Sequence, residues 1–263
     1  MPKKFVDYTF AEGAARITLV DSDRGNPVHT DSAAELLAAV LRAKADGARV
    51  IVLGAQGRFF SVGGALDGFA AAHSPGPLLL ELAEGAHRVV TELVRGDAIV
   101  VSVVQGTAAG IGFPIAAAAD IVIAADSAKF SLAYAKVGLS PDGGGSMLVH
   151  TLGLHRVLRL ALLGDLLTAQ EAFDAGLIAR LVPSDELEET AGKLVAGILA
   201  GSKEALAATK RLVRDVAEPS PESKLRREAE SISRMMGSTS GKEGVRAFLE
   251  KREPVYNAGT GTS

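Results

Sequence analysis

Apolar runs and helical patterns alternate over the first half of the chain, and they predict a layered α/β core. The buried strands expected from apolar, β-branched runs are 17–20, 49–53, 99–104 and 120–124. The helices expected between them are 33–44, with an N-cap from residues 30–32, and 78–95. Strands that are apolar throughout and separated by helices predict a mainly parallel sheet covered on both faces.

From about residue 154 onward the pattern becomes almost wholly helical. The helices expected there are 169–176, 185–201, 203–216, 222–236 and 239–251. A Gly/Thr-rich tail at 258–263 is expected to be disordered. We therefore divide the chain into a core at 1–200 and a C-terminal helical region at 201–263.

Composition narrows the class of protein. Hydrophobic residues make up 48% of the 263 residues and charged residues 22%, which is ordinary for a globular protein. A formal charge of −3 gives no general attraction to nucleic acid or to an anionic membrane. The absence of cysteine excludes disulfides and thiolate chemistry. No apolar stretch follows Lys3 and Lys4, so no signal peptide is predicted, and a cytoplasmic protein without a membrane span is expected.

Three glycine-bearing segments could carry chemistry: 58–66, 105–114 and 138–146. The first two follow predicted strands, and glycine lets backbone N–H groups turn toward a ligand. Two such loops could aim two N–H donors at one oxygen, which is how an oxyanion hole works. The alternative is that the glycines only permit tight turns. The nucleotide-binding motifs G-x-G-x-x-G and G-x-x-x-x-G-K are incomplete or missing.

Several segments, taken together and in order, resemble the crotonase (enoyl-CoA hydratase/isomerase) superfamily over nearly the whole chain. They are 60–66 (FSVGGAL), 104–112 (VQGTAAGIG), 119–124, 128–130, 167–172, 176–178, 182–183 and 248–252. The resemblance implies an α/β fold, with a crotonase-like core of ββα spiral turns and a C-terminal α-helical region that mediates trimerisation. It also implies homotrimers that commonly pair into hexamers.

The resemblance further implies that an acyl-CoA thioester is the substrate and that no separate cofactor is needed, since CoA is part of the substrate. The thioester carbonyl would lie between the backbone N–H groups of Gly64 and Ile111. Ile111 stands where glycine is common in the family. Preorganised donors of this kind stabilise the enolate that forms when the α-proton leaves, and losing one costs about 3–4 kcal/mol.

Five residues match family positions that contact CoA. They are Arg24, Gly25, Leu66, Phe248 and Lys251. A cation suits the CoA phosphates, but for Arg24 an ordinary solvated charge is an equally good interpretation.

The two glutamates that hydratases of this family use are replaced by Pro114 and Tyr134. The acid that remains in the right region is Asp142, in the third glycine-rich segment. The resemblance is closest to isomerase-like members with an aspartate there, in which one carboxylate moves a proton from C2 to C4. An N-cap or turn role for Asp142 is the alternative. Hydratase activity and a non-catalytic acyl-CoA-binding module stay open.

The histidines offer no recognisable metal site. His29, His73, His87, His150 and His155 show no metal-ligand spacing with acids, so no metal is predicted. Segment 70–82 is where we expect the acyl pocket to vary most among relatives.

Overall fold

The computed structural model describes residues 3–67 and 75–256. The predicted tail at 258–263, His73 and the start of segment 70–82 lie outside the described residues.

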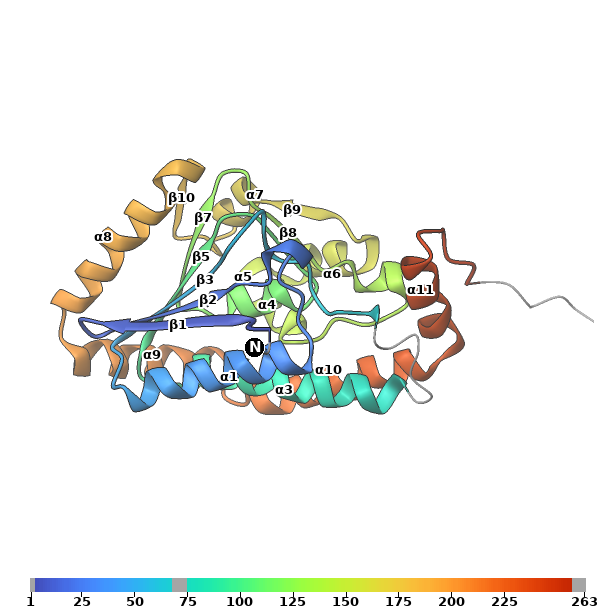
Figure 1. The fold of residues 1–263 in the computed structure, drawn as a ribbon, viewed down its shortest axis with the longest axis horizontal. Helices are drawn as coiled ribbons and strands as arrows, with labels where there is room; N and C mark the ends of the chain where they lie inside the picture. Colours follow the sequence, from blue (N-terminus) through green and yellow to red (C-terminus); the bar gives the residue numbers. More distant parts are fainter. Residues whose placement is uncertain (1–2, 68–74, 257–263) are drawn as a thin grey trace, which may run out of the picture.

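The strands form two sheets (Figure 1). The larger sheet has the order β1 (Val6–Ala11), β2 (Ala14–Leu19), β3 (Val50–Ala55), β5 (Ile99–Val104), β7 (Ile121–Ala125) and β10 (Arg180–Val182). The smaller sheet has the order β4 (Phe59–Ser61), β6 (Thr107–Ala109), β8 (Lys129–Ser131) and β9 (Leu166–Thr168).

The chain repeats a strand–strand–helix unit. After β3 it adds β4 to the smaller sheet and continues to helix α3 (Pro75–Arg95). The next unit is β5, β6 and helix α4 (Gly112–Ala117), and β7 and β8 begin a third. Because β2, β3, β5, β7 and β10 are parallel, their carboxyl ends lie at one edge, where β4 and β6 begin. This is the ββα spiral that the resemblance predicts.

Both faces of the larger sheet are covered, as the apolar strands predict. Val52, Val101 and Ile123 point to one face and pack with Leu187 and Ala191 of helix α8 (Leu187–Ala200). The alternate side chains of the same strands join the main core, which is continuous with helices α1 and α3. Strict alternation between two cores follows from the period of two residues along a strand.

Helix α3 lies between helix α1 (Thr30–Ala45) and helix α10 (Pro221–Gly237), and the three form one layer beneath the sheet (Figure 1). Helix α11 (Thr239–Leu249) follows α10 and packs on the 3-10 helix η2 (Ala133–Val137). The remaining helices are η1 (Ser22–Arg24), η3 (Gly145–Leu148), α5 (Val149–Leu152), α6 (Leu154–Leu163), α7 (Ala169–Asp174), η4 (Ser184–Glu186) and α9 (Lys203–Ala217). No described helix has both the length and the apolarity needed to cross a bilayer.

The fold differs from the sequence prediction in several places. The apolar pattern did not predict the short strands β4, β6 and β8 of the smaller sheet. Strand β1 was not predicted; it pairs antiparallel with β2 through a turn in which Glu12 and Gly13 have φ of 51° and 83°. Helix α1 begins at Thr30, and its N-cap is His29, whose ring accepts a hydrogen bond from the Ser32 amide at 3.4 Å. The region after residue 154 is not wholly helical, because β9 and β10 add short edge strands to the two sheets.

Candidate active site

The first two glycine-rich loops meet where two strands of the smaller sheet end. Strands β4 and β6 pair in parallel, so the loops that follow them leave the sheet side by side. Gly63 and Gly110 have positive φ, 99° and 51°. A Cβ on Gly63 would lie only 3.0 Å from the Ala109 carbonyl oxygen and 3.3 Å from the Gly110 Cα. The two backbones are therefore in contact, and only glycine permits that approach.

The amides of Gly64 and Ile111 are left free for a ligand. On either side of Gly64, the Gly63 amide donates to Ser61 Oγ at 3.1 Å and the Ala65 amide donates to the Val28 carbonyl at 2.9 Å. Neither the Gly64 amide nor the Ile111 amide donates to any residue in the described ranges. Backbone donors without a protein partner are uncommon away from solvent, so two of them beside one cavity suit an anionic oxygen.

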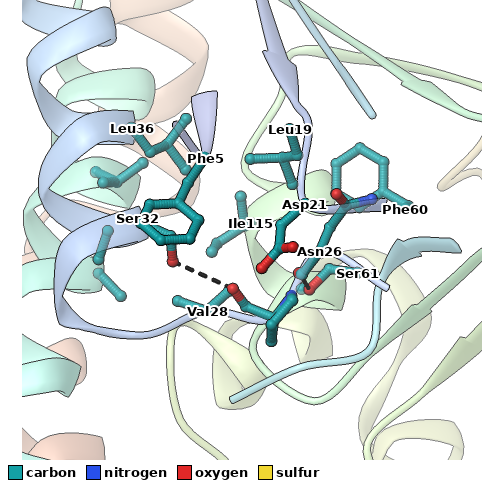
Figure 2. Close-up of a pocket in the computed structure, with 15 residues that line it drawn as sticks. Phe5, Leu19, Asp21, Asn26, Val28, Ser32, Leu36, Phe60, Ser61 and Ile115 are labelled. Atoms are coloured by element: carbon teal, nitrogen blue, oxygen red, sulfur yellow. Dashed lines mark hydrogen bonds between the residues drawn. The ribbon is translucent and has the colours of Figure 1, made fainter. Parts of the chain in front are cut away.

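A polar network behind the first loop holds it in place; Figure 2 shows its members Asn26 and Ser61 beside a small cavity. The Asn26 side-chain amide donates to the carbonyl oxygens of Gln56 and Phe59, both at 2.9 Å. Ser61 Oγ in turn donates to the Asn26 carbonyl at 2.8 Å. Asn26 and Ser61 also line a small cavity of about 20 Å³ beside buried Asp21, which has room for about one water. This cavity is too small for a substrate, so the network's role is to fix the loop that carries Gly64.

A larger cavity of about 260 Å³ lies in front of the two loops. Gly64 and Ile111 line it, and Ser131, Tyr134 and Asp142 contribute polar side chains. Its apolar lining comes from Val62, Leu66, Leu79, Leu82, Val137, Leu139, Ile232 and Phe248. An apolar cavity with a few convergent polar groups is typical of a small-molecule site.

Asp142 is 2% exposed, and its carboxylate faces the side chain of His87 on α3. Asp142 Oδ1 lies 2.7 Å from His87 Nε2. Of the alternative interpretations of Asp142, the N-cap role is wrong, and the turn role stays open. The N-cap of η3 is Gly144, and that helix has no side-chain cap.

Two further side chains fix the loop around Asp142. Glu228 of α10 accepts hydrogen bonds from the amides of Gly144 and Ser146, at 2.7 and 2.8 Å, and from the Ser146 hydroxyl. Burial raises the pKa of the Glu228 carboxyl, although these hydrogen bonds oppose the rise. Tyr134 donates from its hydroxyl to the Asp142 carbonyl at 3.1 Å. Burial, and then the charge of Asp142, raise the pKa of Tyr134 well above its ordinary value, so its hydroxyl stays a donor.

Pro114 and Tyr134, which the resemblance places where hydratases carry glutamates, have separate surroundings. Tyr134 lines the cavity, whereas Pro114 in α4 lines a different cavity together with Gly144. Among the residues that line the main cavity in the described structure, Asp142 is the one carboxylate.

The predicted CoA-contacting residues fall into two groups. Leu66 and Phe248 line the cavity together with Gly64, Ile111 and Asp142. Arg24, Gly25 and Lys251 are not among the lining residues described for that cavity.

Arg24 forms ion pairs with Asp21 at 3.6 Å and with Asp67 at 3.2 Å. Gly25 abuts the first loop, since a Cβ there would meet Val62 at 2.6 Å, and Lys251 is exposed with φ of 54°.

Two residues that meet Asp142 and its loop were not predicted from the sequence. Ligand atoms of His87, Asp142 and Glu228 all lie within 4.8 Å of one another. His87 sits four residues after buried Ala83 and three before buried Val90, inside the apolar stripe of α3. A titratable side chain at a core-facing helical position is the signal that could have marked it, and Glu228 occupies the equivalent place in α10.

Comparisons with known proteins identify the family and the fold. The family model described as "Enoyl-CoA hydratase/isomerase" matches residues 9–259. A Rhodobacter capsulatus protein named "Probable enoyl-CoA hydratase" is 36% identical over 254 residues, which cover 95% of this chain and 97% of the relative.

A second relative, the trans-2-decenoyl-(acyl-carrier-protein) isomerase of Streptococcus mutans, is 30% identical over 260 residues, which cover 97% of this chain and 99% of the relative. Among solved structures, an enoyl-CoA hydratase from Mycobacterium avium subsp. paratuberculosis superposes with a TM-score of 0.88 at 32% identity, covering 97% of this chain and 99% of that one. The spiral of ββα units, the paired glycine loops and these matches together show that the chain belongs to the enoyl-CoA hydratase/isomerase family of the crotonase superfamily.

Proposed function

We propose that this enzyme is an enoyl-CoA isomerase, which moves a double bond along an acyl thioester by way of an enolate. The observation that carries the proposal is the meeting of one buried carboxylate, Asp142, with the free amides of Gly64 and Ile111 at a single cavity. The carboxylate supplies the base, and the two amides supply the oxyanion hole.

The proposed reaction needs one proton carrier. Asp142 takes a proton from C2 of a 3-enoyl thioester, and the electrons of the broken C–H bond pass to the carbonyl oxygen held by Gly64 and Ile111. When the enolate collapses, the double bond lies between C2 and C3, and the proton on Asp142 is delivered to C4. No water, cofactor or metal enters the balance, which suits a cavity whose lining is mostly apolar.

Hydration is the second candidate, because one relative carries the name of a hydratase. Adding water to a 2-enoyl thioester requires one group to activate the water and another to protonate C2. The lining described for the cavity offers Tyr134 and Ser131 beside Asp142, and neither is a carboxylate. The composition of the site therefore favours isomerisation.

For CoA itself, we extend the proposal to Arg24, Gly25, Leu66, Phe248 and Lys251. Leu66 and Phe248 support it because they line the cavity. Arg24 would have to exchange its ion pair with Asp67 for a phosphate, and both side chains are exposed enough to do so, at 44% and 66%. Exposed pairs of this kind contribute only about 0–1 kcal/mol, so a phosphate competes easily.

The test uses 3-hexenoyl-CoA and follows the absorbance of the conjugated 2-enoyl product. We expect Asp142→Asn to lower kcat by about 10²-fold or more, the usual contribution of a general base. Binding of hexanoyl-CoA, which has no double bond to move, should survive. The matched control is Asp126→Asn, which alters an exposed aspartate just after β7.

Three outcomes separate the candidates. Normal turnover by Asp142→Asn would rule out Asp142 as the base. Conversion of 2-hexenoyl-CoA to 3-hydroxyhexanoyl-CoA by the wild-type enzyme would identify water addition and favour the hydratase. If the wild-type protein binds both 3-hexenoyl-CoA and 2-hexenoyl-CoA but converts neither, it is a non-catalytic acyl-CoA-binding module.

A further inference from the structure

His87 and Asp142 form a buried pair that the proposed reaction does not yet use. His87 is 7% exposed, Asp142 is 2% exposed, and 2.7 Å separates His87 Nε2 from Asp142 Oδ1. His87 does not appear among the described residues that line the cavity, whereas Asp142 does. The imidazole therefore stands behind the carboxylate, on the side away from the substrate.

The two contacts of His87 Nε2 assign its proton. The nitrogen lies 2.7 Å from Asp142 Oδ1 and 3.3 Å from the Gly143 amide nitrogen. One ring nitrogen cannot donate and accept at once. The contact with the carboxylate is the shorter of the two and is strengthened by charge. Nε2 therefore carries the hydrogen and donates a hydrogen bond to Asp142.

This assignment distinguishes the two oxygens of Asp142. Oδ1 accepts the hydrogen bond from His87, while Oδ2 has no hydrogen-bond partner among the described residues. We infer that His87 is a positioning residue, which holds Asp142 by Oδ1 so that Oδ2 alone faces C2 and C4 of the acyl group. The inference rests on the proposed function, because it assigns a task to the same carboxylate.

The surroundings of Asp142 explain why a donor is needed at this point. The carboxylate of Glu228 lies close by, and its charge adds to that of Asp142. Tyr134 donates to the main-chain carbonyl of Asp142 and not to its carboxylate. A buried carboxylate without a hydrogen bond is strongly disfavoured. Among the described side chains, His87 is the one that donates to the Asp142 carboxylate.

The same three residues could be taken for a metal site, since His, Asp and Glu are all metal ligands. The hydrogen bonds argue against that interpretation. Both oxygens of Glu228 already accept from Gly144 and Ser146, and Asp142 Oδ1 is in direct contact with His87 Nε2. Hydrogen bonds from His87, Gly144 and Ser146 therefore explain why these three side chains lie close together without a shared metal ion.

A pair of near-isosteric variants tests the inference with 3-hexenoyl-CoA. His87→Gln keeps an N–H donor at a similar reach, whereas His87→Met keeps the bulk and removes the donor. We expect His87→Met to lower kcat by about 10²-fold, the usual effect of misplacing a catalytic group by about 1 Å. KM and hexanoyl-CoA binding should change by less than about 3-fold, since His87 does not touch the substrate, and His87→Gln should recover at least about a tenth of the wild-type kcat.

His155→Met is the control, because His155 is exposed on α6 and should tolerate the change. Equal kcat values for folded His87→Met and wild type would overturn the inference. If His87→Met does not fold, His87→Gln decides alone: a folded Gln variant with kcat lowered about 10²-fold would show that donating a hydrogen bond is not what His87 does.

Asp142→Asn, assayed in parallel, separates the two proposals. Full activity in that variant removes the proposed function itself, whereas an inactive Asp142→Asn beside a fully active His87→Met removes only the role of His87.

Discussion

At the scale of single residues, the side chain of Ile111 packs directly against Gly143. The family resemblance places Ile111 where glycine is common, and the missing side chain of Gly143 leaves room for it. A Cβ on Gly143 would lie 2.5 Å from Ile111 Cγ1, and Gly143 has φ of 74°. The isoleucine side chain therefore packs on the third glycine-rich loop and connects it to the second. This contact fixes the position of the Ile111 amide relative to the Asp142 carboxylate.

Gly143→Ala should therefore lower the free energy of unfolding by more than the cost of the unfavourable backbone conformation alone. The positive φ alone costs about 1 kcal/mol, and overpacking against Ile111 adds about 1–3 kcal/mol. Gly176→Ala is the matched control, since Gly176 has φ of 80° and a Cβ added there would meet nothing within 4 Å. Urea unfolding of the two variants measures the difference; equal losses of stability would show that the Ile111 contact does not matter.

The sequence predicted much of this site, but not all of it. The glycine loops are encoded locally, so Gly64 and Ile111 could be placed beside each other from the strands that precede them. The surroundings of Asp142 could not, because its partner His87 lies 55 residues away, on helix α3, whereas Asp142 lies in a loop. Such a contact depends on the rotation and depth of α3, which an apolar stripe defines only roughly.

At the scale of elements, α3 contacts the third loop through His87, and α10 contacts it through Glu228 and Ser231. Helix α11 closes the cavity with Phe248. The chain after α11 is tied back to it. Arg252 donates to Glu243 at 2.7 Å and 3.1 Å, and the Val255 amide donates to Glu243 at 3.0 Å. The Tyr256 hydroxyl then donates to the Lys136 carbonyl of η2 at 2.9 Å.

This connection should weaken in acid. The hydrogen bonds from Arg252 and then from Val255 lower the pKa of Glu243 from its ordinary 4.5 to about 2. A carboxyl whose pKa is lower in the folded state stabilises the fold fully above its unfolded pKa, and that stabilisation is lost as the pH falls toward the folded value. The urea midpoints of wild type and Glu243→Gln should therefore differ at neutral pH and converge between pH 4.5 and about 2.

Glu253→Gln is the control for this measurement, because Glu253 is exposed and has no ion pair among the described residues. A gap between wild type and Glu243→Gln that stayed constant down to the lowest pH would contradict the assignment to an ionised carboxyl.

Element boundaries show which patterns in the sequence were informative. Strand β5 was predicted at its observed bounds, and α9 and α10 within a residue at each end, because long apolar periods dominate them. Strand β1 was missed although Val6–Ala11 alternates apolar and polar residues, since it lies at the sheet edge with its far half exposed. Strands β9 and β10 have three residues each, too few for any period to appear.

At the scale of the whole molecule, a single chain leaves several large apolar side chains in solvent. On α9, Leu212, Val213 and Val216 are 68%, 59% and 76% exposed. Leu154, Leu162 and Leu163 on α6 are 59%, 68% and 66% exposed. Exposed apolar clusters of this kind commonly mark contacts with other chains, and the family resemblance predicts a trimer or a hexamer.

The apolar face of α9 gives that prediction a direct test. Leu212→Glu with Val216→Glu should shift sedimentation from a trimer or hexamer toward the monomer, because burying two carboxylates at an interface is strongly disfavoured. Lys203→Glu is the control, since Lys203 is exposed on the opposite side of the same helix. A wild-type chain that sediments as a monomer would contradict the prediction, as would a double variant that assembles normally.

Helix α3 links two parts of the molecule that otherwise act separately. Leu79 and Leu82 form part of the wall around the acyl group, and His87, one to two turns further along the same rigid helix, holds the carboxylate. An acyl chain too bulky for the wall would push the helix outward and draw the imidazole off Asp142. The enzyme would then discriminate between acyl chains by kcat and not by binding: acyl-CoA esters that are too bulky would still bind but would rarely be converted.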